Sequence, residues 1–408
     1  MQPPSFSLAS PGFSGSGLSF GKAPPPLGLS RPALGLKPLS KLSAISSRSS
    51  DCNTSFGIKQ EWTPSIWNVK GEDLEMIPDF PLERTHRSIP DATATEVSQR
   101  ISDALRKLSI EAEYDCQKAK AKCKTNDFVS FRIRLYAGGE NGLPVVVEVQ
   151  RRSGSASSFM HSCRAIMNAA EGKALDTRPM KMGPPGMPPI GQMKCLQQAI
   201  QEAPVSDNDG STSALDSVME MLRSRNRDTN VLALENLRSL TDPVKTCFSV
   251  AIRVSKCVAL GDEKYDLREE IQELTERDVF SEGFEEDAGV ARHSQHLRHL
   301  ALCVLSNALA VCLNDGCLVR AMETEHTWFM EHLIPALVAE LKSAKTSACS
   351  AYEAACCCSS LISSSRAAAD LFVSLDAVAT LEAAHEFGKS QHDLLAEEAK
   401  RCLNALRA

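Results

Sequence analysis

The sequence lacks the short motifs by which many enzymes are recognised. It contains no HExxH metal-binding motif, no GxxxxGK phosphate-binding loop, no GxSxG nucleophile turn and no EF-hand calcium loop. It also has no apolar run approaching the ~18 to 20 residues that span a bilayer. We therefore expect a protein with no catalytic site, no cofactor, no bound metal and no membrane-spanning helix.

Fifteen cysteines are present, but no two of them form a CxxC pair. Most lie within apolar helical stripes, which is typical of small buried thiols in a reducing compartment rather than of a secreted disulfide framework. Cys312 and Cys317 flank residues 314–316, Asn-Asp-Gly, a pattern that indicates a helix-ending turn and not half of a zinc site. We expect reduced, metal-free cysteines in an intracellular protein.

The N-terminal residues 1–60 are rich in Ser, Pro and Gly and carry no acidic residue before Asp51. Such a segment cannot bury enough apolar surface to offset its ordering entropy, so we predict a disordered basic tail. A targeting peptide for an organelle is the alternative, because those peptides are also basic and rich in serine. The cytoplasm is the expected location, and the nucleus or an organelle is the alternative if this basic tail acts as a targeting signal.

Residues 61–94 form a proline-broken stretch in which apolar and aromatic residues recur. We predict an extended arm that packs its aromatic side chains on the following domain, with a linear motif for a partner as the alternative. The residues concerned are Trp62, Ile66, Trp67, Phe80 and Leu82.

Residues 95–171 show the pattern of a small α+β domain. Thr95 is a candidate helix N-cap, and alternation of side chains then predicts four strands over residues 111–115, 118–124, 129–136 and 145–150. Ser157 or Ser158 is a candidate cap for a second helix. The order helix, four antiparallel strands, helix follows from these patterns.

Long cations alternate with apolar residues in this domain, and alternation in a strand places them on one face of the sheet. This face is our candidate contact surface for anionic lipid or for a partner protein. Nucleic acid is not favoured, because no aromatic stacking platform accompanies the charges. The candidate residues are Lys118, Lys120, Lys122, Lys124, Arg132, Arg134, Arg151 and Arg152.

Residues 96–170 resemble kinase-associated domain one, a module found at the C-termini of several protein kinases. The likeness lies in Phe-Arg-Ile-Arg-Leu at 131–135, in Val-Glu-Val-Gln-Arg-Arg-Ser-Gly at 147–154 and in the apolar spacing of Phe159, Cys163 and Ile166. The resemblance implies two helices packed on one sheet face and basic residues that bind acidic phospholipids or a kinase domain. Arg151 stands where that family has a basic residue before its Ser-Gly, although no kinase domain precedes the module here.

Residues 172–212 are rich in Pro and Met and predict a partly stiff linker. From residue 213 to 408 apolar residues recur at helical spacing, with stretches at 297–313, 328–341, 351–362, 367–387 and 394–406. Leu-Ile-Pro-Ala-Leu at 333–337 is answered 44 residues later by a similar helix start near Val378. A repeat of this length indicates a solenoid of paired helices. We predict residues 261–290 to be an acidic, solvated insertion between repeats.

The helical segment resembles armadillo repeats, whose Leu-x-Asn-Leu pattern provides an Asn that holds an extended peptide in a concave groove. Leu-Glu-Asn-Leu at 234–237 fits this pattern and Leu-Ser-Asn-Ala at 305–308 nearly fits it. Asn236 and Asn307 are therefore the candidate residues of a peptide-binding groove. The fold expected for the whole chain is a disordered N-terminus, an α+β domain and an all-α armadillo-like solenoid. The expected function is a non-enzymatic adaptor or scaffold that binds a protein or peptide, with recruitment to acidic phospholipids through the basic sheet as the alternative.

Three histidines, His293, His296 and His299, recur every third residue in a predicted helix. The first and third lie about 240° apart around a helix axis, so the three cannot share one metal ion. We therefore predict a solvated helix face at this position.

Overall fold

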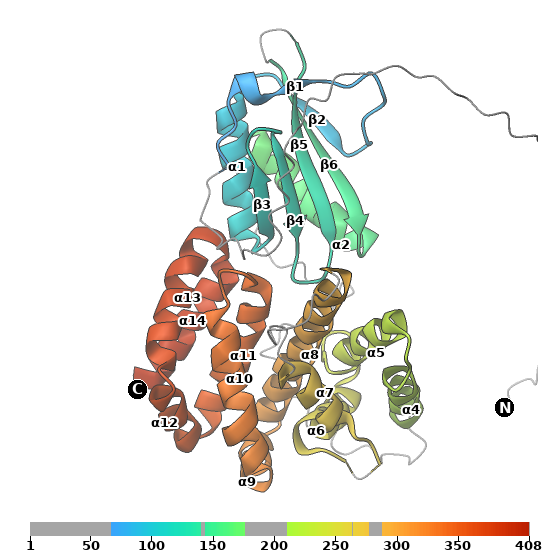
Figure 1. Ribbon diagram of the computed structural model, residues 1–408, viewed down its shortest axis with the longest axis vertical. Helices are drawn as coiled ribbons and strands as arrows, with labels where there is room; N and C mark the ends of the chain where they lie inside the picture. Colours follow the sequence, from blue (N-terminus) through green and yellow to red (C-terminus); the bar gives the residue numbers. More distant parts are fainter. Residues whose placement is uncertain (1–66, 140–142, 176–209, 263, 277–287, 408) are drawn as a thin grey trace, which may run out of the picture. The chain divides into compact units, whose positions relative to one another are not determined.

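The N-terminal part of the chain folds as an antiparallel sheet with helices, and the C-terminal part is helical, as Figure 1 shows. This computed structural model describes residues 67–139, 143–175, 210–262, 264–276 and 288–407. All of these described residues belong to one compact unit. The predicted tail at 1–60 and most of the predicted linker at 172–212 lie outside the described residues.

Four antiparallel strands form where side-chain alternation predicts them. The second begins at Lys120 rather than at Lys118, because residues 116–119 form a turn. The sheet order is β2-β6-β5-β4-β3. The four predicted strands are β3 (Glu111–Asp115), β4 (Lys120–Lys124), β5 (Ser130–Ala137) and β6 (Val145–Ser153).

Two further strands come from the arm and enlarge the sheet to six strands. The arm has a short turn of helix (Gly71–Asp73), then β1 (Glu75–Met76), which pairs parallel to β5, and β2 (His86–Ile89), which pairs antiparallel to β6. These strands were not predicted from the sequence, because they are short and lie among prolines. The predicted aromatic packing holds for Trp67, which is buried and stacks on Tyr114 at 5.6 Å between ring centroids. It does not hold for Phe80, which is 60% exposed; Trp62 and Ile66 lie outside the described residues.

Two helices, α1 (Ala94–Lys107) and α2 (Ala156–Ala170), cover the apolar face of this sheet (Figure 1). Each helix begins slightly earlier than the sequence indicated. Thr93, not Thr95, is the N-cap of α1, because its side chain accepts a hydrogen bond from the Glu96 backbone while the Glu96 carboxylate accepts one from the Thr93 backbone. Ser155, rather than Ser157 or Ser158, caps α2.

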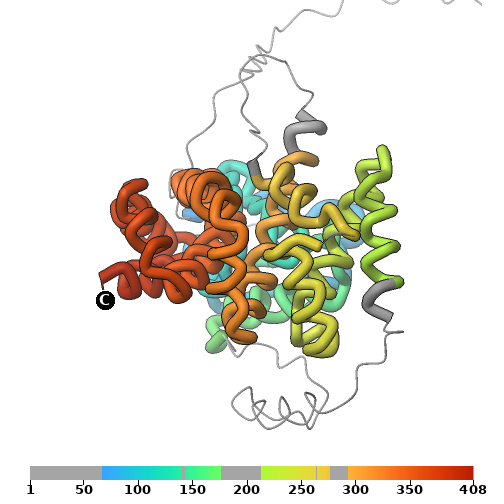
Figure 2. The backbone as a smooth tube through the Cα atoms, turned by 90° about the horizontal axis from the view of Figure 1, so that it is seen from below, coloured from blue at the N-terminus to red at the C-terminus, as the bar shows by residue number. Residues whose placement is uncertain are grey.

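The C-terminal helices follow one another across the helical part in chain order, as the colours in Figure 2 show. Helices α5, α8, α11 and α14 lie side by side in that order. Their apolar sides merge into one core. The helices are α4 (Gly210–Leu222), α5 (Arg227–Leu240), α6 (Phe248–Leu260), α7 (Leu267–Glu276), α8 (Ala288–Asn314), α9 (Leu318–Thr324), the π-helical turn η3 (Trp328–Leu333), α10 (Ile334–Lys342), α11 (Ala348–Ser364), α12 (Arg366–Ser374), α13 (Ala377–Gln391) and α14 (Asp393–Arg407).

Two predictions on these helices need correction. The stretch 367–387 is not one helix: α12 ends before Asp376, whose φ of 58° lies in the left-handed region, and α13 starts after it. The acidic insertion at 261–290 is not wholly solvated, because it contains α7, whose Leu267 and Ile271 side chains are fully buried. Its residues 277–287 lie outside the described part of the chain.

Helix α8 differs most from what the sequence indicated. Its stretch His293–Asn314 is long and apolar enough to cross a membrane by length and composition, contrary to the expectation that no apolar run approaches that length. Within the fold 72% of that window is buried, so it serves as the central helix of the core. The expectation of a solvated histidine face is wrong for the same reason: His299 is only 1% exposed and His296 is partly buried.

Candidate functional site

The basic face of the sheet carries five of the eight predicted cations side by side. Cross-strand pairing places Lys120 opposite Arg134 and Lys122 opposite Arg132, while Lys124 lies opposite Ser130. Side chains of directly opposed residues share a face, so these cations are neighbours. Partial burial, followed by repulsion from Arg132, Lys122 and Arg134, lowers the pKa of Lys120. The cations are therefore close enough to repel one another.

Carboxylates share this face, which is less basic than the sequence indicated. Strand β3 places Glu111, Glu113 and Asp115 opposite the three lysines of β4. Lys122 forms an ion pair with Glu113 at 3.0 Å between Nζ and Oε1. The acidic row was visible in the sequence, but only the register of β3 against β4 puts it on the cationic side.

Of the other three predicted cations, only Arg152 also lies on the basic face. Lys118 lies in the turn before β4, where its backbone N–H donates to Asp115. Arg151 lies opposite Phe131, a core residue, and so belongs to the other face of the sheet, where its guanidinium donates to the carbonyl of Gly154. Arg152 returns to the basic face and donates to Gln150. Its pairing with Phe131 removes Arg151 from the predicted set, and the register of β5 against β6 shifts next to this pair, between Ser130 and Phe131.

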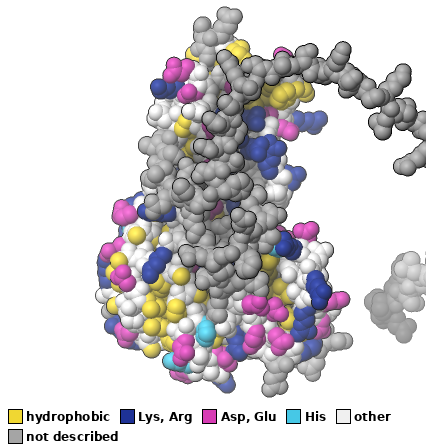
Figure 3. Space-filling model, in the orientation of Figure 1, with side chains coloured by type: hydrophobic (Ala, Val, Ile, Leu, Met, Phe, Trp, Pro, Cys, Tyr) yellow, Lys and Arg dark blue, Asp and Glu magenta, His cyan; other side chains and the backbone are white. Residues whose placement is uncertain are grey.

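An open hollow of about 370 Å³ lies on the basic face at the ends of β3, β4 and β5. In Figure 3, basic side chains gather on the visible surface near the position of β5 and β6, whereas both signs of charge mix over the helices. The hollow has more cations than carboxylates in its lining, which includes Lys122, Lys124, Arg132, Arg152, Glu111 and Glu113.

The two asparagines of the predicted peptide groove have different environments. Asn236 is exposed on α5, one helical turn from Leu232, which is 50% exposed. Asn307 lies on α8, and its amide nitrogen donates to the carbonyl of Arg238 at 3.2 Å and to the hydroxyl of Thr241 at 3.4 Å. Asn307 thus ties α8 to the end of α5, and the structure does not bring the two asparagines together as a ladder.

The loop between β4 and β5 inserts Phe128 into the core of the helices. Phe128 is 9% exposed and has a φ of 65°. Its ring lies 4.7 Å from that of His296 and 4.6 Å from that of His299 between centroids. The Arg238 guanidinium lies 5.4 Å from the ring centroid, a cation–π distance. An aromatic side chain of the sheet part therefore belongs to the helical core.

Polar groups of the sheet part also meet the first turns of two helices. The Glu111 carboxylate accepts a hydrogen bond from the Cys349 backbone N–H at 2.7 Å, in the first turn of α11. The Ser109 hydroxyl accepts one from the Leu394 N–H at 2.9 Å, at the start of α14. Negative charge and acceptors stabilise helix N-termini. Arg106 pairs with Asp393 beside this contact.

His392 is buried at the same junction and is held neutral. Its Nδ1 accepts a hydrogen bond from the Leu395 N–H at 3.2 Å, so the proton is on Nε2, which lies 3.4 Å from the Asn126 side-chain oxygen. Burial lowers the pKa of His392 from 6.5 to about 4. A second proton would remove the acceptor at Nδ1 and leave a buried charge.

The stability of the protein should therefore decrease in acid partly through His392. Because the folded-state pKa lies below the unfolded value, the contribution is complete above pH 6.5 and is lost as the pH falls from 6.5 towards 4. The full loss is on the order of 3 kcal/mol. Denaturant unfolding at several pH values should show a weaker acid dependence for His392→Asn than for wild type. His326→Gln, at an exposed position, is the control; an unchanged dependence in His392→Asn contradicts this assignment.

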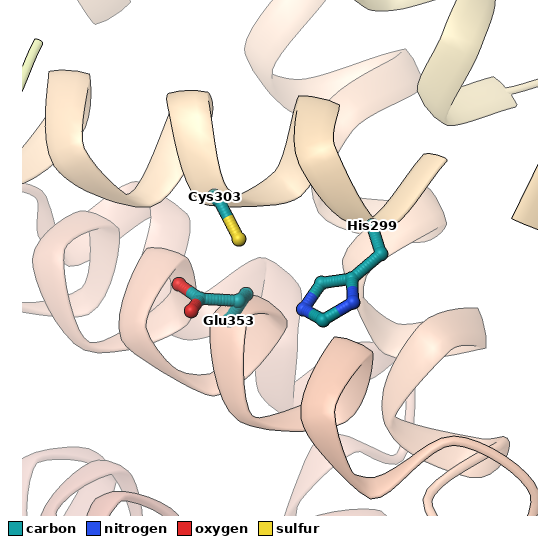
Figure 4. A group of neighbouring side chains, drawn as sticks. All are labelled: His299, Cys303 and Glu353. Carbon is teal, nitrogen blue, oxygen red and sulfur yellow. The ribbon is translucent and has the colours of Figure 1, made fainter. Parts of the chain in front are cut away.

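The polar side chains of His299, Cys303 and Glu353 meet inside the helical core, where no such group was expected from the sequence. His299 and Cys303 lie one turn apart on α8 and point towards Glu353 of α11, as Figure 4 shows. Their ligand atoms all lie within 4.8 Å of one another. Among the described residues, this is the group whose ligand atoms are of the right kind and close enough to one another to hold a metal ion.

The signal for this group was present in the sequence. The other histidines of this helix recur at a spacing that separates them from His299 around the helix axis. A spacing of four to Cys303 places two metal-ligating side chains on one face. Glu353 could not be assigned from sequence, because it comes from a helix that only the tertiary fold places beside α8.

Comparison with known proteins gives no relative: no protein-family model matches the chain, and no curated protein matches it significantly.

Proposed function

We propose that the chain is a non-enzymatic adaptor that binds a protein or peptide partner through an armadillo-like helical array. The observation that carries this proposal is the exposed side of α5. Leu232 is 50% exposed there, and Asn236, the residue that fits the armadillo pattern, lies one turn further on. An apolar anchor beside an amide that can bond a backbone is suited to holding an extended peptide.

The sheet part adds to this proposal without supplying catalysis. In our interpretation it is a module similar to kinase-associated domain one, positioned on the array by Phe128 and by the contacts to α11 and α14. An intracellular, reducing location is part of the same proposal, because the free cysteines are mostly buried as reduced thiols would be.

Partner capture tests the adaptor function. Full-length wild type, the double variant Leu232→Asp/Asn236→Ala and the control Val373→Asp should be immobilised and exposed to cell extract. Val373 is also 50% exposed, on α12. We expect the wild type and the control to retain the same specific proteins and the double variant to lose them. Identical capture by all three contradicts binding through α5.

A second candidate function, binding to an anionic membrane, is favoured by the hollow on the basic face. Three or four simultaneous contacts between cations and anionic lipid, at ~1 kcal/mol each, would give reversible recruitment. Screening over a Debye length of about 8 Å at physiological salt keeps that binding weak.

Charge reversal measures this binding. In co-sedimentation with vesicles containing phosphatidylserine, Arg132→Glu/Arg152→Glu should lower the membrane affinity at least about tenfold. The reason is that two contacts worth ~1 kcal/mol each are lost. The control Lys342→Glu/Lys400→Glu changes the net charge equally at exposed positions on α10 and α14. Equal losses in the two variants, or equal binding of wild type to neutral vesicles, mean that the basic face only keeps the sheet soluble.

A further inference from the structure

The cluster of His299, Cys303 and Glu353 combines three kinds of metal-ligating atom in one buried place. Two of its members come from α8 and the third from α11 (Figure 4). His299 is 1% exposed and Cys303 is 2% exposed. Glu353 is partly buried as a residue, but its carboxylate is enclosed.

The bonding of His299 is the observation that points to a ligand. Neither of its ring nitrogens has a hydrogen-bond partner among the described residues, although both are buried. Buried polar atoms in proteins are almost always bonded, because losing water without replacement is costly. A neutral imidazole has one acceptor nitrogen, and a metal ion is a common partner for it.

The other two members, Cys303 and Glu353, are acids that lie beside each other, with Ser306 and Arg238 near the Glu353 carboxylate. Burial raises the pKa of the Cys303 thiol well above its usual value, and the nearby Glu353 raises it further. Burial also raises the pKa of Glu353, although the hydroxyl of Ser306 donates to it and Arg238 lies near. A divalent cation would balance one thiolate and one carboxylate, so that the buried group as a whole is neutral.

We propose that His299, Cys303 and Glu353 bind a divalent transition-metal ion, with Zn²⁺ as the best fit. Zinc takes imidazole nitrogen, thiolate sulfur and carboxylate oxygen at about 2.0–2.3 Å. The three donor atoms lie within 4.8 Å of one another, so they must move closer together to share one ion at those distances. Calcium and magnesium prefer oxygen ligands alone, and the thiolate and imidazole exclude them.

The ion would act as a structural link between α8 and α11, with a small exogenous donor such as water in the remaining tetrahedral position. Because thiol and carboxyl must lose their protons, binding releases protons and strengthens as the pH rises. This assignment replaces the expectation that the cysteines are metal-free, and it is independent of the proposed adaptor function.

The metal content of the full-length protein tests the proposal. Protein purified without chelator, and a second sample refolded with zinc, should contain stoichiometric zinc by native mass spectrometry. Exchange for Co²⁺ should produce a thiolate-to-cobalt charge-transfer absorption band. Cys303→Ser should abolish that band. Cys312→Ser, which alters another buried cysteine of α8, should retain it.

Affinity measurements separate the ligands from their surroundings. His299→Gln and Glu353→Gln should each weaken zinc binding by more than about a hundredfold. Removing a residue that only hydrogen-bonds to a metal ligand already lowers metal affinity about 10–100-fold, and removing a ligand itself should lower it further. Circular dichroism establishes that each variant is folded. The wild-type measurement does not depend on any variant: folded wild type that binds no stoichiometric zinc overturns the proposal. A cobalt band that survives Cys303→Ser overturns it as well, since another thiol would then hold the ion.

Discussion

Replacing Phe128 with alanine is expected to lower the free energy of unfolding by about 3–5 kcal/mol, the usual cost of truncating a buried phenylalanine. The side chain packs between His296 and His299 in the helical core although it belongs to the loop between β4 and β5. Its removal leaves a cavity and weakens the contact between the sheet part and the helices. Denaturant unfolding, monitored by circular dichroism, measures this change in the free energy of unfolding.

Phe80→Ala is the matched control for this variant. It removes the same number of atoms from a side chain that is 60% exposed and lies in the same part of the chain. We expect its free energy of unfolding to stay close to that of wild type. Similar small losses in both variants would mean that Phe128 is not a core residue and that the two parts of the chain are not joined through it.

Gly154→Ala is expected to have the second large effect, about 2–5 kcal/mol. Gly154 has a φ of 90°, which strains any other residue, and an added Cβ would lie 2.7 Å from the Phe128 carbonyl oxygen and from the Val129 Cα. Strain at such a backbone position costs about 1–3 kcal/mol, and overpacking adds a similar amount. The displaced atoms are backbone atoms of the loop that positions Phe128.

The control for this variant is Gly71→Ala. Nothing lies within 4 Å of the position that a Cβ would take at Gly71. We expect little change in its thermal unfolding, whereas Gly154→Ala should melt at a clearly lower temperature. Comparable melting temperatures for the two variants would contradict the close approach of Gly154 to the loop.

Local alternation made the central strands predictable from sequence. Residues 120–124 and 130–135 alternate so regularly that the face of each side chain follows from a period of two, although the pairing of Lys122 with Arg132 required the register of β4 against β5. The strands of the arm did not follow, because β1 and β2 are short and lie among prolines. They form only because β5 and β6 offer hydrogen-bonding edges, which is a property of the folded sheet.

The helix boundary at Asp376 was missed for a related reason. No glycine or proline marks it, and the apolar spacing continues through it. A two-residue turn, Leu375 and Asp376, separates α12 from α13, and only Asp376 has a positive φ.

The candidate sites depended still more on tertiary structure. The basic face was predicted, but its dilution by Glu113 required the register of β3. Three contacts join residues that are far apart in the sequence. Asn307 bonds to Arg238, Phe128 packs into the helical core, and Glu353 lies beside His299 and Cys303 of α8. Spacing along one helix or strand carries no information on such contacts.

Calorimetric unfolding of the full-length protein measures whether the sheet part and the helices unfold together. Because the two parts share the Phe128 contact and the hydrogen bonds at α11 and α14, we expect one endothermic transition whose calorimetric and van't Hoff enthalpies agree. In Phe128→Ala that transition should broaden or divide. Two separate transitions in the wild type, one for the sheet part and one for the helices, would contradict the account.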